Sequence, residues 1–411
     1  MATAVSAAQE AGLEISVRCG GHSVAGHAVC DRGVMIDLGG MRGVDVDVDA
    51  RRASVQGGAL LGDLDRAAQR VGLVTPAGVV SHTGVGGLTL GGGFGWLSRL
   101  HGLSCDNLVE AEVVTATGDV VVASEDEDPD LLWALRGGGG NFGVVTRFDF
   151  RLHPFDGRVW TTMLTYPADD GEAALATFAE VAADAPRELT LYAWIGAGRA
   201  GPLIPEQWSG RPTMMVAAVY VGDAASGASL VAPLRAARPI AEFAEETTYL
   251  TLQSRADEDG ASGMRRYWKA HFLPALGEAA LTSFLEQGLV VAEGSENVGC
   301  ELFALGGAAC DAAPGETAFE NRRAEWDFIA NATWTDPSDD EHVIAVARRV
   351  AEEIAPHAHG VYTNDLGDEG ADRIRAAYGE TTYERLVRVK DRLDPENVFR
   401  HNQNVRPSAS L

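Results

Sequence analysis

The sequence predicts an α+β protein made of two domains and a C-terminal segment. The chain has 411 residues, more than a single hydrophobic core usually organises. Glycine clusters and short runs of β-branched residues concentrate in residues 1–155. Over residues 156–355, strand-like runs alternate with alanine-rich helical stretches, and residues 356–411 change character again. We therefore expect a first domain at 1–155, a second at 156–355 and a C-terminal segment at 356–411.

Short strands separated by turns are expected in the first domain. Apolar residues at every second position, bounded by glycine and aspartate, are typical of half-buried strands. A Thr-Gly-Asp sequence between two valine-rich runs indicates a hairpin. The expected strands cover residues 34–38, 44–48 and 53–56, a helix covers 60–71, and the hairpin joins 110–117 to 120–123.

The second domain and the tail are expected to contain both strands and helices. Runs rich in Val, Thr, Tyr and Ile are typical of strands. Such runs predict strands at 159–166, 188–195, 213–221 and 301–305, and a further strand at 360–364. A helix is expected to extend to residue 392. Pro395 predicts its end, because a proline pushes the preceding residue out of the helical region.

Composition disfavours several classes of protein. Asp and Glu number 59 against 33 Lys and Arg, and this net charge of −26 disfavours nucleic acid as a partner. No apolar run approaches the ~20 residues of a membrane-spanning helix. The five cysteines are scattered, so neither a disulfide framework nor a metal site is predicted. Because the first residues carry no secretory pattern, we expect a cytoplasmic protein, and no oligomeric state is predicted.

Three glycine clusters in the first domain point to a large phosphate-bearing cofactor. They lie within residues 20–23, 84–95 and 137–143. Glycine lets backbone approach a ligand closely, and successive N–H groups can bind an anion. One cluster alone would more simply be a tight turn, but three together favour a cofactor site. Residues 138–143 fit G-x-G-x-x-G, yet a helix-like run precedes them and a strand-like run follows, the reverse of a Rossmann fingerprint.

Five motifs together resemble the berberine bridge enzyme-like flavoproteins, members of the FAD-binding superfamily that includes vanillyl-alcohol oxidase. The first four are RCGGHSVAG at 18–26, PAGVVSHTGVGG at 76–87, GLSCDNL at 102–108 and RGGGGNFGVV at 136–145. The fifth is the tail, with YTN at 362–364 and DPENVFRHNQN at 394–404. In order and spacing, the resemblance covers nearly the whole chain.

The resemblance implies a PCMH-type FAD-binding domain of two α/β subdomains, the N-terminal one truncated, and a substrate domain whose antiparallel sheet is covered by helices. It implies FAD bonded through its 8α-methyl group to His22, as in bacterial or archaeal members with a single histidyl link. Val80 stands where many relatives carry a second, cysteinyl link. The other implied cofactor-binding residues are Arg18, Gly20, Gly21, Ser23, Gly26, Gly78, Ser81, His82, Thr83, Gly84, Gly86, Gly87, Gly91, Gly92, Gly93, Gly95, Asp106, Asn107, Gly139, Gly140, Asn141, Gly143, Val144, Val145, Asn402 and Asn404.

The same resemblance implies an FAD-dependent oxidoreductase that acts on a small molecule. A hydride would pass from a CH–OH or CH–NH group to flavin N5, and dioxygen would take the electrons as hydrogen peroxide. Tyr362 is the expected base, although packing in the core would also suit a tyrosine there, and Asn364 would position the ring or the substrate. Further pocket candidates are Tyr192, Trp194, Tyr267 and Trp268. A dehydrogenase with another electron acceptor and a non-catalytic flavoprotein are the alternatives.

Overall fold

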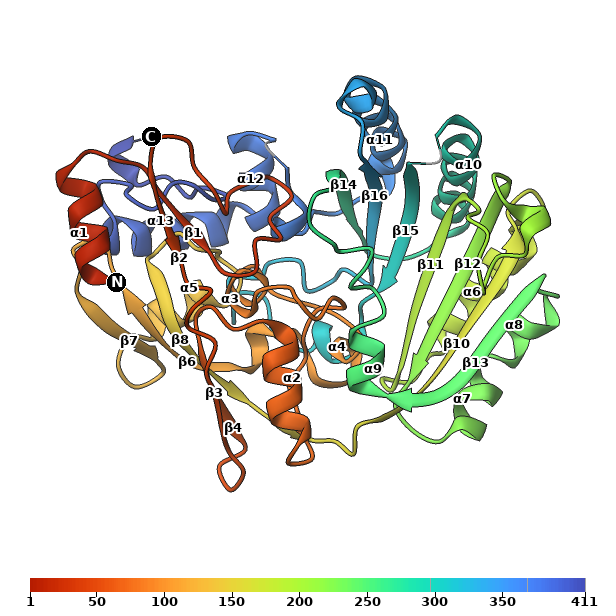
Figure 1. Ribbon diagram of the computed structural model, residues 1–411, viewed down its shortest axis with the longest axis horizontal. Coiled ribbons are helices and arrows are strands. Elements are labelled where there is room, and N and C mark those ends of the chain that lie inside the picture. Colours follow the sequence, from red (N-terminus) through yellow and green to blue (C-terminus); the bar gives the residue numbers. More distant parts are fainter. Residues whose placement is uncertain (296, 368, 411) are drawn as a thin grey trace.

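Two large antiparallel sheets organise the two halves of the molecule (Figure 1). The computed structural model describes residues 1–295, 297–367 and 369–410. Helices cover both sheets, so the predicted α+β class is confirmed. Within the described residues, no helix is both long enough and apolar enough to cross a membrane. The cytoplasmic location stays a prediction.

The first half is built on a five-stranded sheet whose neighbouring strands are all antiparallel. Its order is β3 (Val44–Asp47), β4 (Arg52–Gln56), β8 (Val144–Arg151), β6 (Leu108–Val114) and β7 (Val120–Ser124). Two further pairs are the parallel β1 (Ile15–Arg18) and β2 (Val34–Asp37), and the antiparallel β5 (Leu73–Val74) and β9 (His153–Pro154). The helices are α1 (Ala2–Glu10), α2 (Leu61–Gln69), α3 (Val85–Leu90), α4 (Ser98–His101), α5 (Pro129–Leu135) and the 3₁₀ helix η1 (Cys105–Asn107). The expected strands, helix and hairpin of this half are confirmed.

The third glycine cluster lies between α5 and β8. The helix begins at Pro129, and the Asp128 carboxylate accepts the N–H of Leu131 at 3.0 Å, which caps the first turn. The strand that follows is antiparallel to both of its neighbours. A Rossmann site needs a strand before the glycines and a helix after them. The predicted reversed order is confirmed, so this loop is not such a site.

The second half is built on a seven-stranded antiparallel sheet. Its order is β13 (Ala241–Thr248), β10 (Arg158–Pro167), β12 (Pro212–Tyr220), β11 (Leu189–Ala197), β15 (Val298–Ala304), β16 (Trp326–Trp334) and β14 (Arg265–Leu273). The strands predicted at 159–166, 188–195, 213–221 and 301–305 are confirmed, whereas β13, β14 and β16 were not predicted. The domain borders at 155 and 355 stay a prediction.

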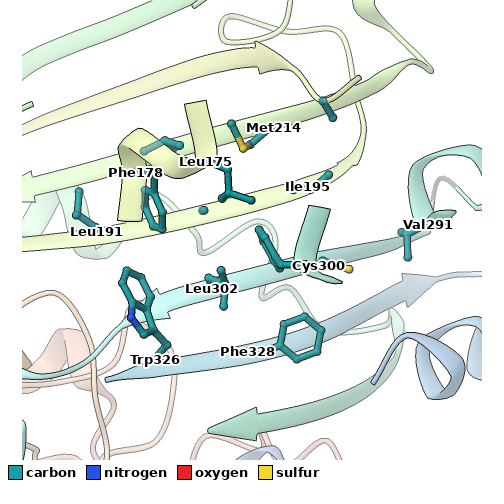
Figure 2. Close-up of a cluster of buried hydrophobic side chains, with 14 of the residues drawn as sticks. Leu175, Phe178, Leu191, Ile195, Met214, Val291, Cys300, Leu302, Trp326 and Phe328 are labelled. Atoms are coloured by element: carbon teal, nitrogen blue, oxygen red, sulfur yellow. The ribbon is translucent and has the colours of Figure 1, made fainter. Parts of the chain in front are cut away.

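Three helices cover one face of this sheet: α6 (Glu172–Ala183), α10 (Glu278–Gly294) and α11 (Asp340–Ile354). Figure 2 shows the core between them, where Phe178, Trp326 and Phe328 are among the buried side chains. Side chains alternate between the two faces along each strand, so every second side chain points to the face that these helices do not cover. The connecting elements are α7 (Ala224–Leu230), α8 (Ala232–Ala236), α9 (Tyr249–Gln253), η2 (Glu206–Trp208), η3 (Gly307–Cys310), η4 (Pro337–Asp339) and η5 (Ala355–His357).

The C-terminal tail returns to the first half (Figure 1). It contains η6 (Thr363–Asp365), α12 (Ala371–Tyr378), α13 (Glu380–Leu393) and η7 (Ser408–Ser410). The predicted end of the helix before Pro395 is confirmed. The strand predicted at 360–364 is wrong, because Gly360 forms only an isolated bridge to Phe272 before the chain turns into η6. The side chains that follow bond elsewhere, with Asn364 donating to the Leu88 carbonyl of α3 and Thr363 to the Gly91 carbonyl just after it.

Candidate active site

The first and second glycine clusters cross with their backbones in contact. A Cβ atom on Gly20 would clash with the backbone nitrogen of Gly84. A Cβ atom on Gly84 would lie 2.5 Å from the sulfur of Cys19. Both crossing positions therefore require glycine. The crossing places the loop that follows β1 against the loop that leads into α3.

The loop after β1 offers a row of backbone donors. Among the residues that the structure describes, none accepts a hydrogen bond from the N–H groups of residues 21–25. Gly21 at φ +75° and Gly26 at φ +77° adopt left-handed conformations that curve the segment. Successive N–H groups in a curved loop form a concave site for an anion.

The Asn141 side chain joins the third glycine cluster to the tail. Its Nδ2 donates to the carbonyls of Gly138 at 2.9 Å and Gln403 at 3.2 Å. Its Oδ1 accepts the N–H of Val405 at 2.9 Å. This buried amide therefore holds the loop in place by hydrogen bonds to backbone groups of the protein. At Gly140, a Cβ atom would meet nothing within 4 Å, so the turn is open to a bound group.

Asn402 and Asn404, near the end of the tail, each carry a buried side-chain oxygen to which no described residue donates. Asn402 Nδ2 donates to the carbonyls of Gly140 at 3.2 Å and Phe399 at 3.1 Å. Within the described part of the chain, Oδ1 of Asn402 and Oδ1 of Asn404 have no hydrogen-bond partner. An unpaired buried acceptor costs free energy. Both oxygens therefore fit a ligand that presents hydroxyl or N–H groups.

Asp106 and Asn107 hold the turn between α4 and β6. The Asp106 carboxylate pairs with Arg322 at 2.5 Å and accepts the N–H of Leu103 at 2.8 Å. The Asn107 amide donates to the same residue's carbonyl at 2.9 Å. The side chains of Asp106 and Asn107 therefore bond to other parts of the protein. The backbone of this turn contacts the second glycine cluster, because the Cys105 N–H donates to the Gly92 carbonyl at 2.8 Å.

The other implied cofactor residues lie in or beside the crossing loops. Arg18 ends β1 and forms an exposed ion pair with Asp37 at 2.9 Å. Gly86 and Gly87 lie in the first turn of α3. Ser23 Oγ accepts the N–H of His27 at 3.3 Å. The remaining positions are Gly78 and Thr83 before α3, Gly91, Gly93 and Gly95 after it, and Gly139, Gly143, Val144 and Val145 at the entry to β8.

Tyr362 is fixed against the loop that follows α3. Its hydroxyl oxygen accepts the N–H of Gly93 at 2.8 Å and Nδ2 of Asn364 at 2.7 Å. A Cβ atom on Gly91 would clash with the Asn364 side chain, so the loop and this pair fit only with glycine there. Burial, and then the charge of Asp365, raise the pKa of Tyr362 well above its ordinary value, while the two N–H donors oppose this rise.

Rings surround the Tyr362 side chain. The ring centroid of Phe94 lies 4.8 Å away, that of Phe272 6.0 Å away and that of Phe319 6.2 Å away. Phe94 lies in the second glycine cluster, whereas Phe272 belongs to β14 of the large sheet. Tyr362 therefore lies where the two halves of the molecule meet.

The uncovered face of the seven-stranded sheet is polar near Tyr362. Glu301 accepts Nδ2 of Asn331 at 2.7 Å, and the Tyr192 hydroxyl lies beside the same carboxyl group. Trp268 Nε1 donates to Oδ1 of Asn331 at 2.9 Å. Trp194 lies directly opposite Glu301 and shares its face. Of the predicted pocket residues, Tyr192, Trp194 and Trp268 therefore lie on this face.

Tyr267 is the exception among the predicted pocket residues. Its hydroxyl accepts a hydrogen bond from Nε of Arg348 on α11 at 2.8 Å. That helix covers the other face of the sheet, so the prediction that Tyr267 lines the pocket is wrong. The reason is the two-residue alternation of side chains along β14, which turns adjacent residues to opposite faces.

Two buried aspartates beside this polar face were missed from the sequence. Asp327 of β16 is 0% exposed and Asp365 is 5% exposed, and the two carboxyl groups lie close enough to influence each other's pKa. Burial raises the pKa of Asp365 to about 8 and raises that of Asp327 as well. The available signal was an aspartate inside the otherwise apolar run WDFIANATW.

His22 and His82 form a hydrogen-bonded pair at the crossing of the first two clusters. Nε2 of His22 lies 2.7 Å from Nδ1 of His82. Nε2 of His82 lies 2.9 Å from the backbone carbonyl oxygen of Asp257. Burial, and then the neighbouring His82, lower the pKa of His22 to about 4. The His22 ring is therefore neutral at physiological pH.

These loops, the open turn at Gly140 and the orphaned tail oxygens fit a large ligand with an anionic part and hydroxyl groups, which FAD is. The family described as "FAD binding domain" matches residues 1–124, and the one described as "Berberine and berberine like" matches residues 361–406. The fold and site thus define an FAD-dependent oxidoreductase.

Relatives place the chain within this class. It is 31% identical over 430 residues to (R)-6-hydroxynicotine oxidase of Paenarthrobacter nicotinovorans, covering 100% of this chain and 89% of that protein. It is 30% identical over 410 residues to an FAD-linked oxidoreductase of Dictyostelium discoideum, covering 98% and 86%. The chain belongs to the berberine bridge enzyme-like family of FAD-linked oxidoreductases.

Solved structures agree with this fold. The 6-hydroxy-D-nicotine oxidase of Arthrobacter nicotinovorans superposes with a TM-score of 0.84 at 28% identity, covering 99% of this chain and 90% of that one. The BBE-like 1 protein of Physcomitrella patens superposes with a TM-score of 0.87 at 24% identity, covering 99% and 88%, and this likeness supports the fold alone.

Proposed function

We propose that the chain is an oxidase that holds FAD covalently through His22 and removes a hydride from a CH–OH or CH–NH group of a small molecule. The observation that carries the proposal is the Tyr362–Asn364 pair, which is bonded to the loop after α3 and lies next to the polar face of the large sheet. A substrate between them would have glycine-loop backbone on one side and polar side chains on the other.

Each part of the site has a role in this proposal. The N–H groups of residues 21–25 would bind the pyrophosphate of FAD. The turn at Gly140, with the Oδ1 atoms of Asn402 and Asn404, would receive hydroxyl or N–H groups of the cofactor. Bound FAD supplies a two-electron acceptor whose N5 atom takes the hydride. The chain's own task is to place the substrate C–H and to accept the proton of the O–H or N–H group.

Tyr362 is the proposed proton acceptor. Its oxygen receives two N–H hydrogen bonds, which stabilise the negatively charged form of the side chain, and burial opposes that form. Asn364 holds the oxygen in place and is itself anchored by its bond to the Leu88 carbonyl at 3.1 Å. The proton needs an acceptor about 2.6–3.2 Å away.

Relatives support dioxygen as the acceptor and a small molecule as the substrate. Two of them are named 6-hydroxynicotine oxidase and chitooligosaccharide oxidase. These names indicate an amine-type substrate for the first and a sugar-type substrate for the second. Both types contain a C–H bond beside nitrogen or oxygen. A substrate screen should therefore contain cyclic amines and oligosaccharides.

The test begins with acid precipitation of purified wild-type protein and the His22→Ala variant. Flavin fluorescence on a denaturing gel then reports the covalent link, and peroxide release in the substrate screen reports the reaction. We expect the wild-type pellet to stay yellow, the variant to release its flavin and at least one substrate class to yield peroxide. Release of flavin from the wild type would refute the link. Anaerobic flavin reduction without peroxide formation in air would refute the oxidase and support the dehydrogenase alternative.

A further inference from the structure

The hydrogen bonds around His22 fix which of its ring nitrogens carries a proton. The chain of contacts runs from the backbone carbonyl of Asp257 to Nε2 of His82 at 2.9 Å, and from Nδ1 of His82 to Nε2 of His22 at 2.7 Å. A carbonyl oxygen can only accept. Nε2 of His82 is therefore the protonated nitrogen of that ring.

The same logic carries over to the second ring. A histidine ring that carries one proton, placed here on Nε2, presents Nδ1 as an acceptor. Nε2 of His22 must then be the donor, and the single proton of the neutral His22 ring lies there. Nδ1 of His22 is left with its lone pair, and among the described residues it has no hydrogen-bond partner. A lone pair is what a nitrogen nucleophile needs.

We propose that His82, held by the backbone of Asp257, is the positioning residue that keeps Nδ1 of His22 unprotonated for covalent attachment of FAD. This inference rests on the covalent link proposed above. In the overall step, one C–H bond of the 8α-methyl group breaks and a bond from that carbon to Nδ1 forms. Alkylation of Nδ1 makes the Nε2 proton acidic, and His82 accepts it. The flavin takes the electron pair and dioxygen then removes it, so that the two hydrogens leave as hydrogen peroxide.

The structure holds His82 in this orientation from both sides. The Asp257 carboxylate accepts the Ser81 N–H at 2.8 Å and the Ser81 hydroxyl at 2.7 Å, so its backbone carbonyl is fixed beside the histidine. A Cβ atom on Gly260 would lie 3.1 Å from Cε1 of His82 and 2.8 Å from Val80. The turn after α9, in the second half of the molecule, therefore packs directly on the ring.

The variants His82→Asn and His82→Leu test this proposal, because their side chains have the same shape and differ in whether they can accept a hydrogen bond. Asparagine places an acceptor oxygen near the position of Nδ1, whereas leucine places a methyl group there. Flavin-free protein from riboflavin-starved cells is incubated with FAD, and covalent flavin is followed by gel fluorescence and intact mass. We expect the leucine variant to incorporate FAD about 10²-fold more slowly than wild type, the lower end of the range for a lost proton acceptor. The asparagine variant should recover part of the rate, because its amide oxygen accepts the hydrogen bond from Nε2 of His22 but cannot take up the proton that imidazole accepts.

Two controls separate a local effect from a general one. His342→Ala, at an exposed histidine of α11, should incorporate FAD at the wild-type rate. Equal non-covalent FAD binding by the asparagine and leucine variants shows that the binding site is intact. If the leucine variant keeps the wild-type rate of incorporation, the inference is overturned while the His22 link stands. If wild type forms no covalent flavin, both are overturned.

A second measurement needs no flavin and identifies the protonated nitrogen of each ring directly. In ¹⁵N-histidine-labelled, flavin-free wild type, the coupling pattern of each imidazole identifies its protonated nitrogen. We expect a proton on Nε2 and none on Nδ1 for both His22 and His82, with assignment from the His22→Ala spectrum. A proton on Nδ1 of His22 would overturn the inference.

Discussion

Replacing Asp365 by asparagine tests whether the buried carboxyl pair keeps a proton at neutral pH. Burial raises the pKa of Asp365 to about 8, and the neighbouring carboxyl of Asp327 is 0% exposed. In the unfolded chain the same group ionises near the ordinary value of about 3.9. Between these values the folded protein binds one proton that the unfolded chain has released. This contribution to stability is therefore fully present below about pH 4 and is lost as the pH rises to about 8.

The expected size of the change in stability follows from the binding of a single proton. Stability changes by about 1.4 kcal/mol per pH unit, so wild type should lose about 2–3 kcal/mol relative to Asp365→Asn between pH 5 and pH 7. Urea unfolding of both proteins at each pH measures this difference, and it cancels the titration of groups that do not interact with Asp365. The exposed Asp126→Asn variant should show no such trend. A difference between wild type and Asp365→Asn that stays constant with pH would refute the raised pKa of Asp365.

Three further predictions concern the loops and the tail. Lys390→Met should lower the free energy of unfolding by about 3–5 kcal/mol in a denaturant titration, because it leaves the fully buried Asp394 carboxylate without its 2.7 Å ion pair. As a control, Arg158→Ala removes an exposed ion pair and should lower the free energy of unfolding by less than about 1 kcal/mol. Gly20→Ala should abolish FAD binding in a flavin-content assay, because its Cβ would clash with the second loop; normal flavin content would contradict this. Tyr362→Phe should retain flavin and lower turnover about 10²–10⁴-fold in a peroxide assay, and unchanged turnover would exclude it as the base.

Local patterns predict much of the first half. The strands at 34–38 and 53–56 and the helix at 60–71 follow from the spacing of apolar residues, which depends only on neighbours in the chain. The order of helix, glycines and strand around 137–143 is enough to exclude a Rossmann site, because that order is visible in the sequence itself. The family is recognisable because its motifs are short and keep their order.

The large sheet was only half predicted. Its strand β13 (AEFAEETT) is rich in alanine and glutamate, which favour helices, and pairing with β10 overrides that preference. The segment 360–364 failed in the opposite way, because its pattern suits a strand but Tyr362 and Asn364 bond to the glycine loop. In both cases a long-range partner decided the backbone conformation.

The sequence by itself determined the fold class, the family and the glycine loops, because these depend on local spacing and on residues with no Cβ atom. Only the tertiary structure decided which side chains meet. It placed Asp365 beside Asp327 and Tyr192 beside Glu301. It also placed the carbonyl of Asp257, 175 positions away, where it accepts a hydrogen bond from Nε2 of His82. Burial and hydrogen-bond partners set protonation, and both arise only when distant segments pack together.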